Sequence, residues 1–382
     1  MKRLASGGGV MEPYIPDTLP LETIDWIAHI PHIGKANAAL ARYDGILRGM
    51  VNPRILLSPM TTREAVLSSR IEGTQASLED VLQYEADSKI SLTPEKHADI
   101  QEIINYRTAM NTAVDYLQKR PLCTNMIRDI HRILLTSTRG RDRAPGEIRR
   151  TQNYIAPAST PIEAATFVPP SPLMVMDALS NWEIYLHSEE KDTLVQLAIL
   201  KAQFELIHPF SDGNGRIGRM LVPLILYSKK LLGSPMFYIS AYLEQNRDEY
   251  YERLLAISRS GDWNDWISFF LRAVVEQAEE NGQKVQHILM LYDDMKQKVP
   301  EITHSKYAIQ AIDAIFSRPI FQSLDFIRSS KIPKESAKRI LSGLKNAGVL
   351  EVMRERIGRR PAVYVFPQLI AISEVVEVVS HT

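Results

Sequence analysis

The chain has 382 residues, 45% of them hydrophobic, and its 45 lysines and arginines balance 45 aspartates and glutamates. This length exceeds a single ordinary hydrophobic core and predicts about two or three domains, while the zero net charge argues against a protein that coats nucleic acid along its whole length. The single cysteine, Cys123, excludes a disulfide framework and indicates a reducing compartment. No leader segment and no apolar run long enough to cross a bilayer is recognisable, so we expect a soluble cytoplasmic protein without a membrane partner.

The first part of the chain is predicted to be helical, because apolar residues recur at spacings of three and four. An N-terminal helical region is expected over residues 1–95, followed by a core domain over 96–285. The opening residues, MKRLASGGGV, have the composition of a flexible tail. The predicted helices of this part cover residues 61–73, 77–87, 98–118 and 124–138.

Residues 139–172 have a different composition, rich in proline, glycine and threonine. Two short extended segments, 149–155 and 165–169, lie on either side of a turn-prone stretch. We therefore expect an irregular β-hairpin at about 149–170, set among helices. The helices that follow are predicted at residues 173–189, 192–207, 216–232, 248–260 and 263–297.

The last part of the chain changes character again and reads as short helices followed by two strands. Residues Ser336–Leu344 are predicted to form the second helix of a helix-turn-helix, and the strands at 349–353 and 362–366 would form a wing. The expected fold class of the whole chain is therefore mainly α, with a small α+β domain of winged-helix type at its end. The segments predicted here are a linker at 286–300, the winged-helix-like domain at 301–370 and a tail at 371–382.

This C-terminal part is basic, although the whole chain is neutral. Between Phe326 and Phe366 there are ten lysines and arginines against three aspartates and glutamates. A winged helix of this charge either binds DNA or serves packing and formation of a homodimer. If it binds DNA, the phosphate contacts are predicted at Lys338, Arg339 and Lys345 on the second helix and at Arg359 and Arg360 in the wing.

The densest group of chemically functional residues is HPFSDGNGRIGR, residues 208–219. Its glycines spell GxGxxG, but a dinucleotide-binding turn needs a strand before them and an acidic residue about 20 positions later. Here a helical segment precedes the glycines, no acid follows before Glu244, and the GxxxxGK[ST] pattern of a Walker loop is absent. What remains is a helix, a glycine-rich turn and a second helix.

A turn of this kind suits phosphate. Gly213-Asn214-Gly215 can adopt positive φ, so that successive backbone N–H groups converge on an anion. The next helix, expected from about Arg216, adds N–H donors and partial positive charge at its start. Arg216 and Arg219 are three positions apart and can both face a triphosphate.

Two further side chains give this turn its chemistry. Asp212 would be repelled by bound phosphates unless a cation lay between them, and Mg²⁺ is the usual cation. His208 offers a neutral imidazole as a general base at physiological pH. Each residue alone has a plainer explanation, such as a loop histidine or a solvated helix start, but together they predict a site of phosphate transfer.

HPFSDGNGRIGR resembles the signature of the Fic family, HxFx[D/E]GNGRxxR, at every specified position. The resemblance implies a compact helical bundle that transfers AMP from ATP to a Ser, Thr or Tyr hydroxyl of a protein target. His208 would deprotonate that hydroxyl, Asp212 would hold Mg²⁺, and Phe210 would anchor the loop. The residues implied in binding ATP are Gly213, Asn214, Gly215, Arg216, Gly218 and Arg219.

The resemblance also gives roles to the predicted hairpin and to two tyrosines. The hairpin is similar to the family's flap, which lies over the site and holds a target segment by strand addition; an ordinary surface loop is the alternative. Tyr250 and Tyr251 resemble residues on the adenine side, although both also fit an ordinary helix core. The flap residues implied at the border of the pocket are Ile155, Ala156, Phe167 and Val168.

A second motif, SSRIEGT at residues 68–74, ends a predicted helix. Glu72 lies just before Gly73, the expected C-cap, where its charge opposes the helix dipole. An exposed, solvated Glu72 explains this arrangement on physical grounds alone. However, Ser68-x-x-x-Glu72-Gly73 resembles the family's inhibitory motif [S/T]xxxE[G/N], which implies that Glu72 pairs with Arg219 and blocks productive binding of ATP.

We therefore predict a self-inhibited protein adenylyltransferase that uses ATP and Mg²⁺. Two alternatives stay open: a DNA-binding regulator whose core senses nucleotide or modifies itself, and a transferase with another nucleotide or diphosphate donor. The presence of His208 favours an enzyme over a sensor, and the two arginines of GNGRIGR favour a triphosphate donor. Reversal of the modification at the same site also stays open.

Overall fold

The computed structural model describes residues 12–136, 143–156, 165–356, 358 and 360–374. The described chain is mainly helical and contains one three-stranded sheet, which confirms the prediction of a mainly α protein. It divides into two compact units. The first comprises residues 1–38, 108–230 and 245–275, and the second comprises residues 39–107, 231–244 and 276–382.

The boundary between the units falls within three long helices, α1 (Trp26–Arg48), α5 (Pro94–Leu117) and α12 (Trp263–Thr303). No individual helix was predicted where α1 lies, although α1 falls within the region 1–95 that was expected to be helical. The predicted linker at 286–300 is helical and belongs to α12, because this stretch still buries an apolar face. The side chains on that face are Ile288, Met295 and Val299.

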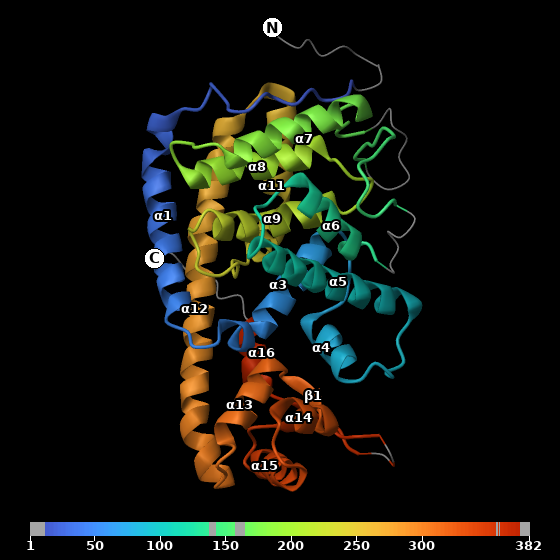
Figure 1. The fold of residues 1–382 in the computed structure, drawn as a ribbon, viewed down its shortest axis with the longest axis vertical. Coiled ribbons are helices and arrows are strands. Elements are labelled where there is room, and N and C mark those ends of the chain that lie inside the picture. The colour runs from blue at the N-terminus through green and yellow to red at the C-terminus, as the bar shows by residue number, and fades with distance from the viewer. Residues whose placement is uncertain (1–11, 137–142, 157–164, 357, 359, 375–382) are drawn as a thin grey trace. The chain divides into compact units, whose positions relative to one another are not determined.

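The first unit is built around α8 (Thr193–Ile207), whose residues from Leu194 onward are all buried. Its start is fixed by Asp192, whose side chain accepts hydrogen bonds from the N–H groups of Leu194 and Val195. A helix covered on every side gives the loop that follows a rigid support. The helices packed against it are α7 (Pro172–His187), α9 (Asn214–Ser228) and α11 (Arg247–Ser260) (Figure 1).

The second unit contains α3, the helix that carries the SSRIEGT motif, and α3 is largely buried. The Glu64 carboxylate of α3 accepts a hydrogen bond of 2.6 Å from the Ser240 hydroxyl. Arg107 donates to the Thr62 hydroxyl at 2.7 Å. The short elements of this part are α2 (Pro53–Leu56), α3 (Ser58–Ile71), α4 (Leu78–Ala86) and α10 (Ser240–Gln245).

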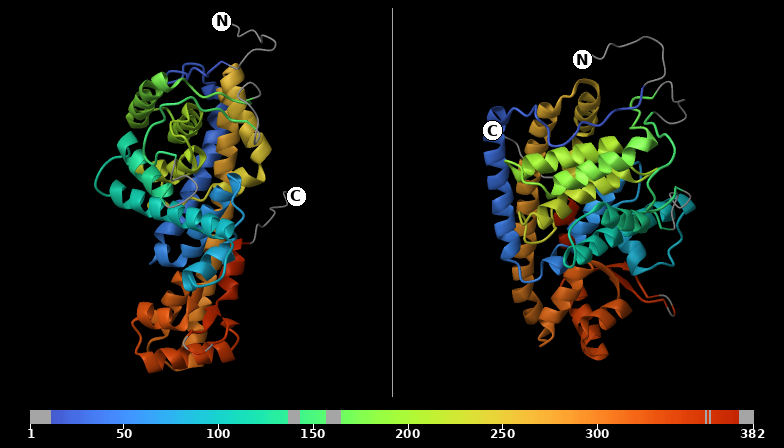
Figure 2. Two further views of the ribbon diagram at one scale, coloured as in Figure 1. Left: turned by 90° about the vertical axis from the view of Figure 1, so that its right-hand side faces the viewer. Right: turned by 45° about the horizontal axis from the view of Figure 1, so that its top comes forward.

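The C-terminal part of the second unit is a cluster of short helices with the three-stranded sheet (Figure 2). Its strand order is β1-β3-β2 and both pairings are antiparallel. Strand β1 was missed by the sequence analysis, because three residues between two helices carry too little periodicity. The winged-helix assignment stays a prediction. The elements are α13 (Ala308–Ser317), β1 (Ile320–Gln322), α14 (Ser323–Ser330), α15 (Lys334–Asn346), β2 (Glu351–Arg354), β3 (Val363–Val365) and α16 (Pro367–Glu374).

Within the second unit, this cluster packs on α4. Leu78, Leu82 and Ala86 of α4 form one buried apolar cluster with Ile320 of β1 and Val363 of β3. Because α4 follows α3 in the chain, the C-terminal sheet and the helix that carries the SSRIEGT motif are linked through α4.

A buried ionic contact reinforces this packing. Asp87, at the end of α4, is 5% exposed and accepts hydrogen bonds from Arg354 and, at 2.7 Å, from Arg360. Burial alone would raise the pKa of Asp87, but the hydrogen bonds from the two arginines outweigh it and lower the pKa. Arg360 therefore pairs with Asp87, whereas the sequence analysis named it as a phosphate contact in case the domain binds DNA; Arg359 lies outside the described residues.

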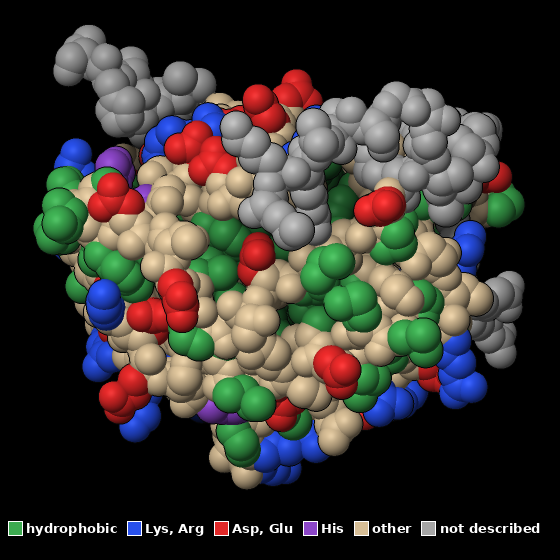
Figure 3. Space-filling view, turned by 90° about the horizontal axis from the view of Figure 1, so that it is seen from above, with side chains coloured by type: hydrophobic (Ala, Val, Ile, Leu, Met, Phe, Trp, Pro, Cys, Tyr) green, Lys and Arg blue, Asp and Glu red, His purple; other side chains and the backbone are tan. Residues whose placement is uncertain are grey.

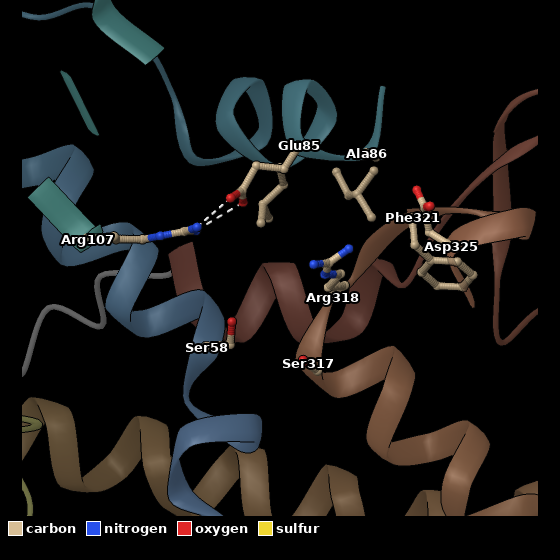
Figure 4. A pocket seen from close by; sticks show the side chains of 10 residues that line it. Ser58, Glu85, Ala86, Arg107, Ser317, Arg318, Phe321 and Asp325 are labelled. Carbon is tan, nitrogen blue, oxygen red and sulfur yellow. Dashed lines mark hydrogen bonds and ion pairs between the residues drawn. The ribbon is translucent and has the colours of Figure 1, made fainter. Parts of the chain in front are cut away.

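A cavity of about 220 Å³ in the second unit is lined by residues of α3, α4, α5, β1 and α14 and by the end of α13 (Figure 4). Arg107 and Glu85 form a two-pronged ion pair on one side of it, with one N–O distance of 3.0 Å. Arg318, at the end of α13, extends toward its middle. Arg107 thus contacts both α3, through Thr62, and α4, through Glu85.

One face of the molecule is mixed in character. Figure 3 shows a face on which hydrophobic, acidic and basic side chains are interspersed, in keeping with the zero net charge. Among the residues that the structure describes, none of the helices combines the length and the apolar character that a membrane span requires.

Candidate active site

The site is built on the end of α8, where His208 is the C-cap residue. Its backbone is left-handed, with φ 50° and ψ 60°, a conformation that costs a non-glycine residue free energy and is typical of functional positions. The Nδ1 atom of the imidazole lies 3.2 Å from the carbonyl oxygen of Glu205. Since a carbonyl only accepts, Nδ1 carries the proton, and the neutral ring has its basic lone pair on Nε2.

The loop after His208 is closed by Asn214 and Phe210. The Phe210 N–H donates to Asn214 Oδ1 at 2.9 Å, and Asn214 Nδ2 donates back to the Phe210 carbonyl at 2.8 Å. Phe210 is buried, as predicted for an anchor, and stacks on His131 with ring centroids 3.8 Å apart. The Asn214 side chain therefore shapes the loop. Any contact between Asn214 and phosphate would be made by its backbone N–H group.

Helix α9 begins at Asn214, two residues earlier than predicted. Its N-cap, Gly213, has φ 78°, a conformation that favours glycine. A Cβ atom there would lie 3.3 Å from Leu134 and 3.4 Å from His131, both in α6 (Thr124–Leu134). The first turn of α9 thus presents backbone N–H groups that have no partner within the helix. Anions bind to this arrangement.

Asp212 and Arg216 lie together at this helix start. Asp212 Oδ1 accepts the Gly213 N–H at 2.5 Å and lies 3.3 Å from an Arg216 nitrogen. The Asp212 side chain is 43% exposed and that of Arg216 only 5%. Among the described residues no group of three or more His, Cys, Asp or Glu could hold a metal ion. Asp212 fits Mg²⁺ as a single carboxylate ligand, the mode in which Mg²⁺ keeps waters and binds substrate phosphates.

Gly218 and Arg219, both implied in binding ATP, are buried residues of α9. A Cβ atom on Gly218 would meet Glu205 Oε1 at 2.6 Å, so this glycine allows α9 to approach α8 and faces protein instead of nucleotide. Arg219 is 1% exposed. Gly215 is the glycine of the signature that is partly exposed.

A buried polar network behind the loop escaped the sequence analysis. Lys201 Nζ lies 2.8 Å from Glu205 Oε1 and 3.0 Å from the Tyr250 hydroxyl, which donates to Glu205 Oε2 at 2.5 Å. Burial lowers the pKa of Lys201, an effect that Glu205 opposes and the charge of Arg219 increases. The sequence feature that could have indicated this network is a lysine and a glutamate four positions apart in the apolar run LVQLAILKAQFELI.

The two tyrosines of α11 have different environments. Tyr250 is 1% exposed, and burial raises the pKa of its hydroxyl, so the structure favours the alternative of a core residue. Tyr251 is 43% exposed, and its ring packs against that of Tyr250 with centroids 5.0 Å apart. Tyr251 stays the candidate for contact with an adenine ring.

In the described part of the predicted hairpin there is one antiparallel bridge, Ile155 to Phe167, in place of two full strands. Ile155 is 44% exposed and Ala156 is partly exposed, whereas Phe167 and Val168 are buried. Both backbone groups of Ile155 are engaged in this bridge, because its N–H donates to the Phe167 carbonyl at 2.8 Å and its carbonyl accepts the Thr166 N–H at 2.8 Å. The turn at 157–164 lies outside the described residues.

Arg149, at the base of this hairpin, was also missed. Its guanidinium donates to the carbonyls of His208 at 2.8 Å, Thr151 at 3.2 Å and Pro170 at 2.5 Å. Burial lowers its pKa to about 10, so it is charged at neutral pH. One side chain therefore ties both ends of the hairpin to the histidine.

The SSRIEGT motif ends a helix, as the sequence predicts, but the C-cap lies one residue earlier than the expected Gly73. Helix α3 ends at Ile71, Glu72 is its exposed C-cap residue, and Gly73 follows with φ 103°. Ser68, by contrast, is fully buried. Its hydroxyl therefore belongs to the interior of the second unit.

Comparisons with known proteins identify this arrangement. Residues 30–115 match the model of the Fic/DOC family N-terminal region, and residues 121–226 match that of the Fic/DOC family. The chain is 27% identical over 200 residues to a probable protein adenylyltransferase of Aquifex aeolicus, covering 51% of this chain and 53% of that one. It is 29% identical over 206 residues to the protein adenylyltransferase Fic of Drosophila grimshawi, covering 52% and 37%. The chain thus spans about half or less of the length of these curated relatives.

Solved structures of low sequence identity have the same fold. A Fic family protein from Desulfovibrio desulfuricans G20 aligns with a TM-score of 0.56 at 20% identity, covering 93% of this chain and 98% of that one. Fic-1 of C. elegans aligns with a TM-score of 0.52 at 21% identity, covering 69% and 73%. Two family models that together follow the chain from residue 30 to residue 226, and the complete signature at 208–219, agree: this chain belongs to the Fic/DOC family.

Proposed function

We propose that this chain is a protein adenylyltransferase, which transfers AMP from ATP to a Ser, Thr or Tyr hydroxyl of a protein target. The observation that carries the proposal is the setting of His208: its Nδ1 lies 3.2 Å from the Glu205 carbonyl oxygen, so that Nε2 would be the proton acceptor, in a loop that leads directly into the start of α9. The curated relatives are named protein adenylyltransferases, which supports the same reaction.

In this reaction His208 Nε2 takes the proton of the target hydroxyl as its oxygen attacks the α-phosphorus. A bond forms between that oxygen and phosphorus, and the bond to the β-phosphate oxygen breaks, so that pyrophosphate leaves. The N–H groups at the start of α9 and the Arg216 guanidinium balance the negative charge of the phosphates. Mg²⁺ held by Asp212 would neutralise the phosphates further.

We further propose that Glu72 inhibits the enzyme by pairing with Arg219. The motif Ser68-x-x-x-Glu72-Gly73 supports this, together with the exposed position of Glu72 at the end of α3. Arg219 engaged by a carboxylate is lost to the γ-phosphate of ATP, which lowers productive binding. A cytoplasmic location is also proposed, because the one cysteine suits a reducing compartment.

The test follows label transfer to protein from ATP carrying the radiolabel on its α-phosphate, and separately on its γ-phosphate, with Mg²⁺ present. We expect label only from the α position, weak in the wild type and strong in Glu72→Gly. Adding His208→Ala to Glu72→Gly should lower transfer by about 10²- to 10⁴-fold, the usual contribution of a general base. His32→Ala, which replaces an exposed histidine of the same unit, serves as the matched control.

Three results would contradict the proposal. Label from the γ position would mean phosphoryl transfer. Equal transfer by the wild type and Glu72→Gly would remove the inhibitory role of Glu72. Unchanged transfer after His208→Ala would remove the general base.

A further inference from the structure

A cavity of the first unit lies outside the predicted site. Its volume is about 580 Å³, and it is formed by the end of α6, the segment 145–150 and the start of α7. Cavities of this size are typical of ligand-binding sites. Four arginines, Arg128, Arg132, Arg149 and Arg150, line it.

The charge of this cavity is strongly positive, because among the residues that the structure describes four arginines and a single acidic residue, Glu147, line it. Arg128 donates from Nε to the Gly146 carbonyl at 2.9 Å, which fixes the stem of its side chain. Arg132 is exposed and pairs at 3.0 Å with Asp129, a surface contact of small energetic value. Arg150 is exposed as well.

The opposite wall is apolar and open to solvent. Leu173 is 90% exposed and Met176, one helical turn later on α7, is 54% exposed. Both line the cavity. Apolar side chains next to arginines are typical of surfaces that bind other proteins, and methionine adapts to partners of varied shape.

Two bridges connect the cavity wall to the signature loop. The Gly146 N–H donates to His131 Nδ1 at 2.8 Å, and His131 Nε2 donates to the Asp212 carbonyl at 2.9 Å. The Arg149 N–H donates to the Pro209 carbonyl at 2.9 Å, and its side chain reaches His208. A molecule held in the cavity is therefore fixed relative to the histidine, without contacting it.

We propose that this cavity docks an acidic segment of the protein target, with carboxylates on the arginines and an apolar side chain against Leu173 and Met176. This inference rests on the proposed function, because it names the class of protein target that the transferase would modify. Arginine binds carboxylates in two-pronged geometry. The apolar wall favours such a peptide over a nucleic acid, whose backbone would leave Leu173 and Met176 uncovered.

The experiment measures binding directly and without nucleotide, so that it does not depend on transfer of AMP. The full chain is titrated into a fluorescein-labelled peptide of Glu-Glu-Leu repeats, and anisotropy is followed. Peptides of Lys-Lys-Leu and Glu-Glu-Ser repeats and a single-stranded DNA oligonucleotide are run in parallel. We expect the Glu-Glu-Leu peptide to bind best and to weaken as salt is raised.

Charge reversal locates the binding. Arg132→Glu with Arg150→Glu should weaken the Glu-Glu-Leu peptide by roughly tenfold or more, since like charges then face each other. Lys35→Glu with Arg259→Glu, two exposed positions of the same unit, makes the same change in net charge and should bind like the wild type. Leu173→Ser with Met176→Ser should weaken the Glu-Glu-Leu peptide and leave the Glu-Glu-Ser peptide unchanged.

Equal binding by the arginine variant and its control would overturn the proposal. So would stronger binding of the DNA or of the Lys-Lys-Leu peptide, or no binding of the Glu-Glu-Leu peptide at low salt. If the chain transfers AMP but does not bind the Glu-Glu-Leu peptide, the docking site alone is refuted. A chain that binds the acidic peptide through these arginines but transfers no AMP refutes the proposed function alone.

Discussion

The signature loop and the C-terminal sheet both contain arginines close to a carboxylate, but they use them differently. In the loop, the shape comes from uncharged groups, Asn214 and Phe210, and the contact between Arg216 and Asp212 is open on the carboxylate side. In the sheet, Arg354 and Arg360 converge on Asp87, whose carboxylate is buried.

This difference shows how to distinguish an arginine that is available to a ligand from one that has a structural role. A guanidinium beside a half-exposed carboxylate can exchange that partner for a ligand at small cost, because exposed pairs contribute little. Arginines that converge on a buried carboxylate hold two elements together, and removing them leaves a buried charge. An arginine next to a carboxylate therefore indicates a binding site in one region and a structural joint in the other.

The largest expected effect tests the support behind the loop. Glu205→Ala leaves the Lys201 ammonium buried without its carboxylate and should lower the free energy of unfolding by about 3–5 kcal/mol. Urea unfolding measures the change. The double variant Lys201→Met with Glu205→Leu, which removes both charges, should lose less than the single variant. A single variant as stable as the wild type would mean that the network does not support the loop.

A smaller effect is expected from Gly218→Ala, which tests the contact of α9 with α8. The added methyl group would lie 2.6 Å from Glu205 Oε1, so the helices must separate or the carboxylate must move. Overpacking of this kind costs about 1–3 kcal/mol. Gly215→Ala, at a partly exposed position of the same helix, is the control for helix propensity. Equal stability of the two variants would contradict the packing role of Gly218.

The smallest effect concerns the C-terminal joint. Asp87→Asn should lower the free energy of unfolding at neutral pH by about 1–2 kcal/mol, because it weakens charge-assisted hydrogen bonds from Arg354 and Arg360. The folded-state pKa of Asp87 is lowered, so its contribution is complete above the unfolded pKa of about 3.9 and is lost as pH falls through the lower folded value. Unfolding of both proteins across this acidic range should show the difference shrinking.

The same variant sharpens the comparison by a second readout. If α15 and the strands bind duplex DNA, two released guanidinium groups should raise affinity and steepen its dependence on salt. Glu335→Gln, which frees the exposed Lys338 from a surface pair, is the matched control. Affinity unchanged in Asp87→Asn, with stability lowered as expected, would show that these arginines serve the joint alone.

The sequence was most informative where interactions are local. Within 208–219, glycine and asparagine at fixed spacing determine the turn, so the helix, the loop and the next helix were predicted with only a two-residue error at Asn214. The long amphipathic helices followed from periodicity. The ends of α3 and the exposed position of Glu72 also depend on neighbours in the chain.

The rest depends on partners that are distant in the sequence. Tyr250 looks like a base-stacking residue in the sequence, but its hydroxyl bonds Glu205, which lies 45 positions away. Arg149 reads as one of several arginines, and its role appears only when Pro170 and His208 surround it. Arg360 was counted toward DNA because its partner, Asp87, is 273 residues distant. Periodicity and composition contain no record of such pairings.

The convergence on Arg149 has a consequence for how a target would be aligned. Thr151 and Pro170, which flank the hairpin, and His208, which bears the base, all bond one planar guanidinium. A peptide that pairs with the hairpin would therefore be held in a fixed register relative to the base by a single rigid group. The position of the acceptor hydroxyl in the peptide sequence would then decide whether it lies at His208. Lysine cannot provide this alignment, because its donors share one nitrogen atom and do not form a flat fork.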